Sequence, residues 1–187
     1  NNNTVRAEGT GAYGIYISSV SGKNFFNDNN VSANSSYTIY LATATNAQFN
    51  NTILAQARII NDSDWIYSDA NSRNNFTNTT FASPAGSIAI LPRIQLNSTT
   101  ITWKLINITQ NKAFLNSTAL PYFNTSSIIT LTGLTSDNPK IMVSYKDDST
   151  YVDCPASQCT NLSYSGGILV FNTTRFTSYK TQDTDDV

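Results

Sequence analysis

Short apolar pairs recur along the first half of the chain, 22 to 27 residues apart. The pairs are Ile15-Tyr16, Ile39-Tyr40, Ile66-Tyr67 and, without the tyrosine, Ile88-Ala89-Ile90. After each of the first three comes a Phe, then Asp or Asn two residues later, then an apolar residue five after the Phe. These positions are Phe26, Phe49 and Phe76; Asp28, Asn51 and Asn78; and Val31, Leu54 and Phe81.

This period is typical of a solenoid in which each repeat holds three short strands. Asn and Asp tolerate the left-handed backbone that the bends between such strands require. We therefore predict an all-β chain whose residues 1–91 form a short right-handed parallel β-helix, with one coil per repeat. Stacking of coils about 4.8 Å apart places the Ile, Phe and Val/Leu positions inside and lets repeated Asn form an amide ladder.

Alternation directs the tyrosine of each pair outward, so Tyr16, Tyr40 and Tyr67 are expected to form an exposed row. This row is a candidate platform for stacking on glycans, although ordinary cross-strand stacking is the simpler interpretation. Asn3-Thr4-Val5 resembles the late part of a coil, Asn51-Thr52-Ile53, so the sequence begins in mid-coil. We expect upstream coils, a cap or a neighbouring subunit to cover such an open end.

After Leu91-Pro92 the repeat stops and short strand-like stretches follow, among them the alternating run from Thr100 to Ile108. Turn-forming residues separate these stretches. The pattern predicts a small antiparallel, immunoglobulin-like β-sandwich over residues 92–180, followed by an acidic tail at 181–187. The further predicted strands are Arg93–Leu96, Ala113–Leu115, Ile128–Leu131, Ile141–Tyr145, Tyr151–Asp153 and Ile168–Phe171.

Composition narrows the classes of function. Only 12% of the residues are charged, the net charge is −1, and there is no His. The chain instead carries 24 Asn, 22 Ser and 25 Thr. These values argue against a nucleic-acid partner and exclude Ser-His-Asp catalysis. No apolar run approaches the ~18 residues of a membrane helix, so we predict no membrane span in this chain.

Thirteen Asn-X-Ser/Thr motifs occur, about twice the number that chance placement gives. We expect many of them to carry N-glycans, while clustering of Asn and Ser/Thr in shared turns explains part of the excess. The candidate acceptors are Asn2, Asn30, Asn34, Asn50, Asn61, Asn75, Asn78, Asn97, Asn107, Asn116, Asn124, Asn161 and Asn172.

The only two cysteines, Cys154 and Cys159, are separated by four residues. Without further Cys or His they cannot complete a structural zinc site, and a redox motif has two intervening residues. We predict a local disulfide, with two free thiols as the alternative. A disulfide agrees with a secreted or cell-surface protein.

Two acidic clusters are the only candidates for catalysis. The first comprises Arg58, Asp62, Asp64, Asp69 and Arg73. Polysaccharide lyases use carboxylates to hold Ca²⁺ and an Arg or Lys as base, so weak Ca²⁺ binding near Asp62, Asp64 and Asp69 is one interpretation of this cluster. We nevertheless expect a solvated loop there.

The second cluster is Asp147-Asp148, which we interpret as a charged turn. Glycoside hydrolases need paired carboxylates across a cleft, and adjacent residues diverge. We thus expect no enzyme, no catalytic or metal-binding residue and no cofactor.

Residues 1–91 resemble the parallel β-helix repeats of pectate-lyase-like and NosD-like proteins. The order Cys154-Pro155…Cys159, Tyr164-Ser165-Gly166-Gly167 and Phe176-Thr177-Ser178-Tyr179 resembles a C-terminal module of large archaeal surface proteins. That resemblance covers about residues 93–180 and implies a surface protein. Such proteins typically carry a membrane anchor further on, whereas this sequence ends in Asp183-Thr184-Asp185-Asp186-Val187.

These observations together predict an extracellular structural protein, a glycosylated building block of a cell surface, filament or sheath. It would self-associate into a homopolymer through β-edges or end-to-end contacts. The alternatives are a carbohydrate-binding adhesin module, motivated by the tyrosine row, and a degenerate polysaccharide lyase.

Overall fold

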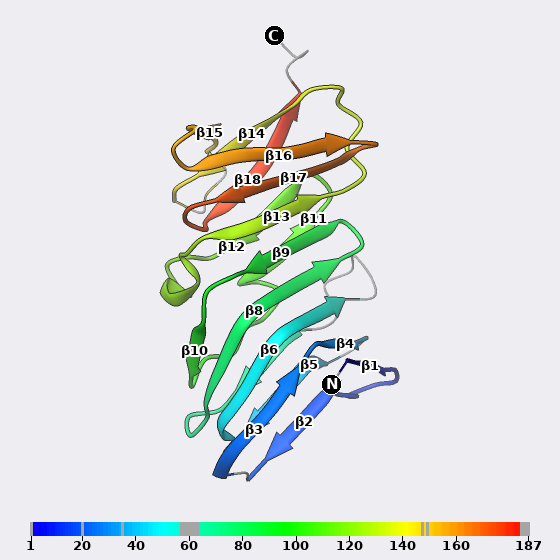
Figure 1. The fold of residues 1–187 in the computed structure, drawn as a ribbon, viewed down its shortest axis with the longest axis vertical. Helices are drawn as coiled ribbons and strands as arrows, with labels where there is room; N and C mark the ends of the chain where they lie inside the picture. The colour runs from blue at the N-terminus through cyan, green and yellow to red at the C-terminus, as the bar shows by residue number, and fades with distance from the viewer. Residues whose placement is uncertain are drawn as a thin grey trace. The chain divides into compact units, whose positions relative to one another are not determined.

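The computed structural model describes residues 2–19, 21–34, 36–56, 64–146, 148 and 150–183. Over these ranges the chain consists of β-strands and loops with a single 3₁₀ turn, η1 (Pro121–Phe123), and no α-helix (Figure 1). The predicted all-β class is therefore confirmed. The chain divides into two compact units: unit 1 is Asn1–Pro84 with Leu91–Trp103, and unit 2 is Ala85–Ile90 with Lys104–Val187.

Parallel ladders build unit 1. Strands β2, β5 and β7 form one ladder, β3, β6 and β8 a second, and β1, β4, β6 and β8 a third. The strands are β1 (Asn3–Ala7), β2 (Ile15–Ser18), β3 (Ser21–Asn27), β4 (Asn29–Ala33), β5 (Tyr37–Ala42), β6 (Thr45–Gln56), β7 (Asp64–Ser68), β8 (Arg73–Ser83) and β10 (Ile94–Asn97).

The register of these ladders aligns the repeat positions read from the sequence. Each Ile-Tyr pair meets the next, the three Phe residues meet one another, and Val31 meets Leu54, which meets Phe81. Phe49 stacks on Phe26 and on Phe76 with ring centroids 4.7 and 4.6 Å apart. Because Phe49 is fully buried, its side chain contributes about 2–3 kcal/mol of hydrophobic stabilisation.

The predicted amide ladder is present at one bend. Asp28, Asn51 and Asn78 have left-handed φ values of 55°, 49° and 48°. The Nδ2 of Asn51 donates to Oδ1 of Asp28 at 2.9 Å, and the Nδ2 of Asn78 donates to Oδ1 of Asn51 at 3.0 Å. Each bend thus satisfies the polar side chain of the next and fixes where the strands turn.

The segment after β8 closes two of the ladders in unit 1. Strand β10 pairs antiparallel with β8, and Ile101 forms an antiparallel bridge with Ile66. Both Ile94 and Leu96 are buried there. The predicted strand from Thr100 to Ile108 was wrong, because the Ile101 bridge and a turn at 103–105 separate Ile101 from the strand that starts at Ile106.

Two antiparallel sheets form unit 2, with the orders β9-β13-β17-β16 and β11-β12-β18-β14-β15. Phe171 on the first sheet contacts Tyr179 on the second with ring centroids 5.7 Å apart. The strands are β9 (Gly86–Ile90), β11 (Ile106–Thr109), β12 (Lys112–Leu115), β13 (Ser127–Leu131), β14 (Pro139–Ser144), β15 (Val152–Asp153), β16 (Cys159–Ser165), β17 (Ile168–Thr173) and β18 (Ser178–Asp183).

Two predicted segments take other roles. Ile88-Ala89-Ile90, predicted as a fourth repeat, lies in β9 and pairs antiparallel with β13. The close approach requires Gly86, where a Cβ would lie 2.0 Å from the Thr130 carbonyl oxygen. The predicted tail begins inside a strand, since Thr181 pairs with Ile141 in β18 and β14. Residues 184–187 lie outside the described part.

Replacement of Phe49 by Ala should destabilise unit 1 by about 3–5 kcal/mol, because it leaves a cavity between two stacked rings. Phe25→Ala is the matched control, because the Phe25 side chain lies next to the stack in sequence but is exposed. This change should lower the free energy of unfolding by less than about 0.5 kcal/mol. Urea unfolding followed by circular dichroism measures both. Equal shifts in the two variants would contradict the internal stack.

Candidate functional site

Five tyrosines gather on the outer face of the β2-β5-β7 ladder. The rings of Tyr16, Tyr40 and Tyr67 stack nearly parallel, with centroids 5.1 and 4.3 Å apart. Tyr13 lies 4.6 Å from Tyr40, and Tyr37 lies 5.5 Å from Tyr67, both tilted. The predicted row thus exists, and the sequence pattern missed two members because Tyr13 and Tyr37 stand outside the repeated pair.

Stacking decides what this tyrosine row can bind. The ring of Tyr40 has a parallel partner on both faces, Tyr16 and Tyr67, so neither face is open to a sugar. Tyr16 ends the stack and its side chain is 58% exposed. Burial raises the pKa of Tyr40, with smaller contributions from Tyr67 and Tyr13, so its phenol stays neutral at physiological pH.

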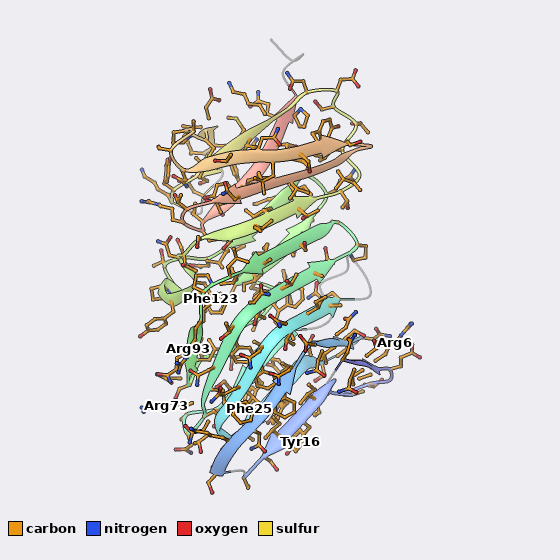
Figure 2. The ribbon with its side chains drawn as sticks, in the orientation of Figure 1. Arg6, Tyr16, Phe25, Arg73, Arg93 and Phe123 are labelled. Carbon is orange, nitrogen blue, oxygen red and sulfur yellow. A yellow bond between two sulfur atoms is a disulfide. The ribbon has the colours of Figure 1, made fainter. Side chains whose placement is uncertain are left out.

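The outer edges of β1, β2 and β3, here called the coil edge, form the second feature. Each strand pairs on one side, and no other strand in the described part of the chain pairs with the opposite side. Tyr16 and Phe25 project from β2 and β3 beside this edge (Figure 2), and Phe25 is 59% exposed. Unpaired backbone next to exposed rings is suited to pairing with another strand.

Charge along the coil edge is balanced. Arg6 and Glu8 form an ion pair of 2.6 Å, and both side chains are largely exposed. Lys23 on β3 and Asp28 at the bend supply one further positive and one further negative group. The edge therefore presents no net charge that would repel a second copy.

The two described aspartates of the first acidic cluster, Asp64 and Asp69, lie apart along β7. Asp64 and Asp69 stand at opposite ends of β7, five residues apart, which corresponds to about 16 Å along a strand. One Asp64 carboxylate oxygen accepts the Trp103 N–H at 3.0 Å. Arg58 and Asp62 lie outside the described residues, and Arg73 begins β8.

Asp69 ties two coils together. One carboxylate oxygen accepts the Thr43 N–H at 2.7 Å, and the other accepts the Ser72 hydroxyl at 2.7 Å and the Asn71 N–H at 3.1 Å. The Ser72 hydroxyl, followed by the backbone N–H groups of Thr43 and Asn71, lowers the pKa of the Asp69 carboxyl against the opposing effect of burial. One oxygen thus holds the loop after β7 and the other holds the turn after β5, which is a structural use of the carboxylate.

Asp148, from the second cluster, organises a turn. Its carboxylate accepts the Thr150 N–H at 2.8 Å and the Ser144 hydroxyl at 3.2 Å, and the Thr150 N–H is the main cause of its lowered pKa. Its neighbour Asp147 lies outside the described residues. The bonding of Asp148 agrees with the interpretation as a charged turn.

Residues in and beside the Cys-Pro…Phe-Thr-x-Tyr motif of the second half come together around the buried hydroxyl group of Tyr179. Cys154 and Cys159 form the predicted disulfide, and the loop between them carries Gln158. Gln158 Nε2 donates to the Tyr179 hydroxyl at 2.7 Å, and the Thr173 hydroxyl lies 2.6 Å from it. Burial raises the pKa of Tyr179. These residues are spaced for packing and hydrogen bonding inside unit 2, so the motif specifies structure.

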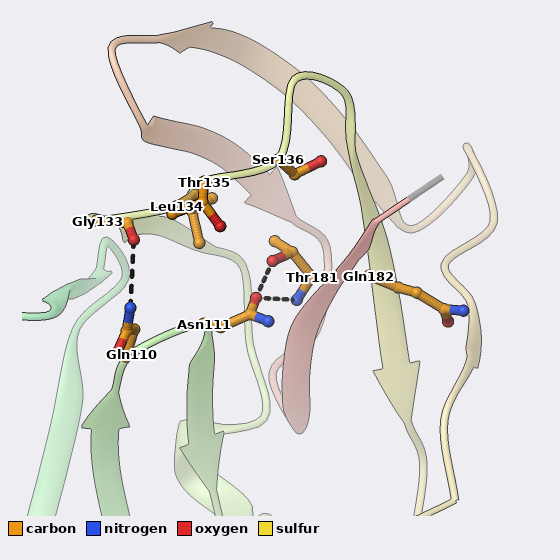
Figure 3. Close-up of a pocket in the computed structure, with 8 residues that line it drawn as sticks. All are labelled: Gln110, Asn111, Gly133, Leu134, Thr135, Ser136, Thr181 and Gln182. Carbon is orange, nitrogen blue, oxygen red and sulfur yellow. Dashed lines mark hydrogen bonds between the residues drawn. The ribbon is translucent and has the colours of Figure 1, made fainter. Parts of the chain in front are cut away.

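A pocket of about 500 Å³ opens beside the β11-β12 hairpin of unit 2 (Figure 3). All eight residues that line it are uncharged. The carboxamide oxygen of Asn111 accepts the N–H and the hydroxyl of Thr181, and Gln110 Nε2 donates to the Gly133 carbonyl at 3.4 Å. The pocket amides thus already tie the hairpin to its neighbours.

Every candidate glycan acceptor in the described part of the chain is at least partly exposed. The exposed ones are Asn2, Asn30, Asn78, Asn97, Asn124, Asn161 and Asn172. The half-buried ones are Asn34, Asn50, Asn75, Asn107 and Asn116. Asn61 lies outside the described residues. The buried Asn29 and Asn74 stand one position before Asn30 and Asn75, so strand alternation turns the acceptor outward.

Comparison with known proteins gives no relative: no protein-family model matches the chain, and no curated protein or solved structure is similar to it. Among the described residues, no three or more His, Cys, Asp or Glu side chains are grouped to hold a metal ion. Over the same ranges, no helix has the length and apolar character needed to cross a membrane.

Replacement of Asp69 by Asn should reveal the contribution of its carboxylate through pH. Because the folded pKa is lowered, the stabilisation is present above the ordinary value of 3.8 and is lost as pH falls through the folded pKa. The difference in thermal stability between wild type and variant should therefore shrink as the solution is acidified. Asp137→Asn, an exposed change in unit 2, is the control for loss of one negative charge. A difference independent of pH would contradict this role.

Proposed function

We propose that the protein is an extracellular structural protein that self-associates through the coil edge. We infer that unit 1 is a short right-handed parallel β-helix and unit 2 a small β-sandwich. The parallel, in-register ladders and left-handed Asx bends support the first inference. The second rests on two antiparallel sheets that share buried aromatic contacts.

The observation that carries the proposal is the coil edge, with which no further strand of the described residues pairs. Three neighbouring strands offer backbone hydrogen-bonding groups there, and the exposed rings of Tyr16 and Phe25 lie beside them. Natural sheets usually protect such edges with charges, prolines or a covering segment. Among the described residues of this edge, the charges are few and balanced, which favours association over protection.

Closure at the other end of unit 1 determines the symmetry of this association. Strand β10 and Ile101 cover the β8 and β7 ladders there. A coil edge then meets a second coil edge, which is an isologous contact with two-fold symmetry and antiparallel strand pairing. Such a contact gives a dimer as the building block, and a homopolymer requires a second contact surface.

Location outside the cell rests on three features. The Cys154–Cys159 disulfide persists in oxidising compartments. Thirteen acceptor motifs, none of them buried in the described part, are suited to N-glycans. Neutral amides and hydroxyls replace charges on the surface. The resemblance of the second half to archaeal surface-protein modules supports the same location.

A carbohydrate-binding adhesin module is the second candidate, favoured by the tyrosine row. Since the stack occupies both faces of Tyr40, a sugar has access to the ring edges and to the outer face of Tyr16. This leaves less aromatic surface than the sequence alone suggested. A degenerate polysaccharide lyase has weaker support, because Asp69 is engaged by hydrogen bonds.

Replacement of Tyr16 by Lys should weaken self-association by about tenfold or more, because the two-fold contact brings both new charges together. Sedimentation velocity over a concentration series measures the dissociation constant. The matched control is Tyr122→Lys, an equally drastic change at a 70% exposed tyrosine of η1 in unit 2. A wild-type chain that stays monomeric at high concentration would refute the proposal. Equal effects of Tyr16→Lys and Tyr122→Lys would show that the contact does not lie at the coil edge.

A glycan array separates the two candidates. If the protein is a structural building block, wild type should show no saccharide signal above background. If it is an adhesin, Tyr16→Ala should reduce a clear signal severalfold, since Tyr16 carries the open ring face. A strong signal that disappears in Tyr16→Ala would replace the structural proposal by the adhesin.

A further inference from the structure

The fold sorts the candidate glycan acceptors by what their amide nitrogens already do. Asn50 Nδ2 donates to Asn27 Oδ1 at 2.8 Å, and Asn78 Nδ2 donates to Asn51 Oδ1 at 3.0 Å. These nitrogens are the atoms to which a glycan would be joined. A sugar there would also have to fit between side chains of coils that are only about 4.8 Å apart. Asn50 and Asn78 are therefore poor acceptors in the folded protein.

Asn172 is the opposite case. It lies on β17, is exposed, and its side chain makes no hydrogen bond in the described part of the structure. Its acceptor motif is completed by Thr174, whose backbone N–H donates to the Gln158 carbonyl at 3.0 Å. In register, Asn172 stands between Ile128 on β13 and Thr160 on β16. Its amide is thus free, on an inner strand of the sheet and near the end of that strand.

That face carries no charged residue in the described strands. Strands β9, β13, β17 and β16 lie side by side (Figure 1), and we call their outward side the neutral face. Ile168 is 45% exposed there, and Leu162, at a bulge of β16, is 53% exposed. The residues of the neutral face are Ser87, Ala89, Ile128, Thr130, Thr160, Leu162, Ser163, Ser165, Ile168, Val170 and Asn172.

We propose that Asn172 carries an N-glycan that covers the neutral face, while Asn50 and Asn78 remain unmodified. This inference rests on the extracellular location proposed above. The donor class is a polyprenyl-diphosphate-linked oligosaccharide. A bond forms between Asn172 Nδ2 and the anomeric carbon, the bond from that carbon to the diphosphate oxygen breaks, and the proton from Nδ2 leaves with the diphosphate.

The glycan would direct assembly. An uncharged sheet face with exposed Ile, Val and Leu side chains packs readily against another such face, as the layers of a β-sandwich do. A bulky hydrated glycan on Asn172, which lies on an inner strand of this face, prevents this packing in unit 2. Association is then left to the coil edge of unit 1. The acceptor amides of Asn50 on β6 and Asn78 on β8 are tied into ladders and add no glycan to that unit.

Glycopeptide mass spectrometry of the full chain, secreted from a host with N-glycosylation, tests the assignment. The folded, secreted fraction should be occupied at Asn172 and unoccupied at Asn50 and Asn78. Thr174→Ala leaves Asn172 in place but removes the acceptor motif, so it should lose the mass of one glycan. Thr174→Ser keeps the motif and should keep the glycan.

The covering role has its own readout. Loss of the glycan in Thr174→Ala should raise the fluorescence of a bound apolar dye severalfold and add concentration-dependent association that Tyr16→Lys does not suppress. Asn124→Gln, which removes an exposed acceptor motif next to η1, is the matched control and should change neither. Occupancy at Asn50 or Asn78, an unmodified Asn172, or unchanged dye binding in Thr174→Ala would overturn the inference. Native material without any glycan would instead count against the proposed extracellular glycoprotein.

Discussion

In-register stacking of equivalent residues is the constraint on which unit 1 depends. Parallel pairing places each side chain next to its counterpart one coil away, so like charges at a repeated position would repel one another. Asn and aromatic residues avoid this cost, because an amide donates to the next amide and a ring stacks on the next ring. The ladder from Asp28 through Asn51 to Asn78 holds one carboxylate, which accepts the first amide. Parallel stacking therefore favours uncharged side chains at the repeated positions of unit 1.

The same constraint explains the coil edge of unit 1. A stacked coil satisfies its backbone only when both neighbours are present, and within the described ranges β2 and β3 each pair with one strand. In unit 2 the two sheets are joined at the buried Tyr179 hydroxyl, which bonds to Gln158 and Thr173. The outward side of its β9-β13-β17-β16 sheet is the neutral face. The two units therefore present different problems, pairing in one and covering in the other.

Much of unit 1 could be predicted because its information is local and repeated. The spacing of Ile-Tyr, Phe and Asx positions predicted the parallel register, the internal Phe stack and the left-handed bends. Ile88-Ala89-Ile90 misled the prediction, because an alternating apolar triplet has the same appearance in a parallel and in an antiparallel strand. The antiparallel ladder with β13 and the close approach of Gly86 to Thr130 decide the pairing, and both involve residues distant in sequence.

The sequence by itself determined the all-β class, the repeat, the disulfide pairing and the set of acceptor motifs, since each depends on residue type and short spacing. Tertiary structure alone decided how these parts are used. It separated Asp64 from Asp69 along β7, occupied both faces of Tyr40, and engaged the amide of Asn78 while leaving that of Asn172 free. The physical reason is that hydrogen bonding and ring stacking between coils depend on which residues become neighbours in space.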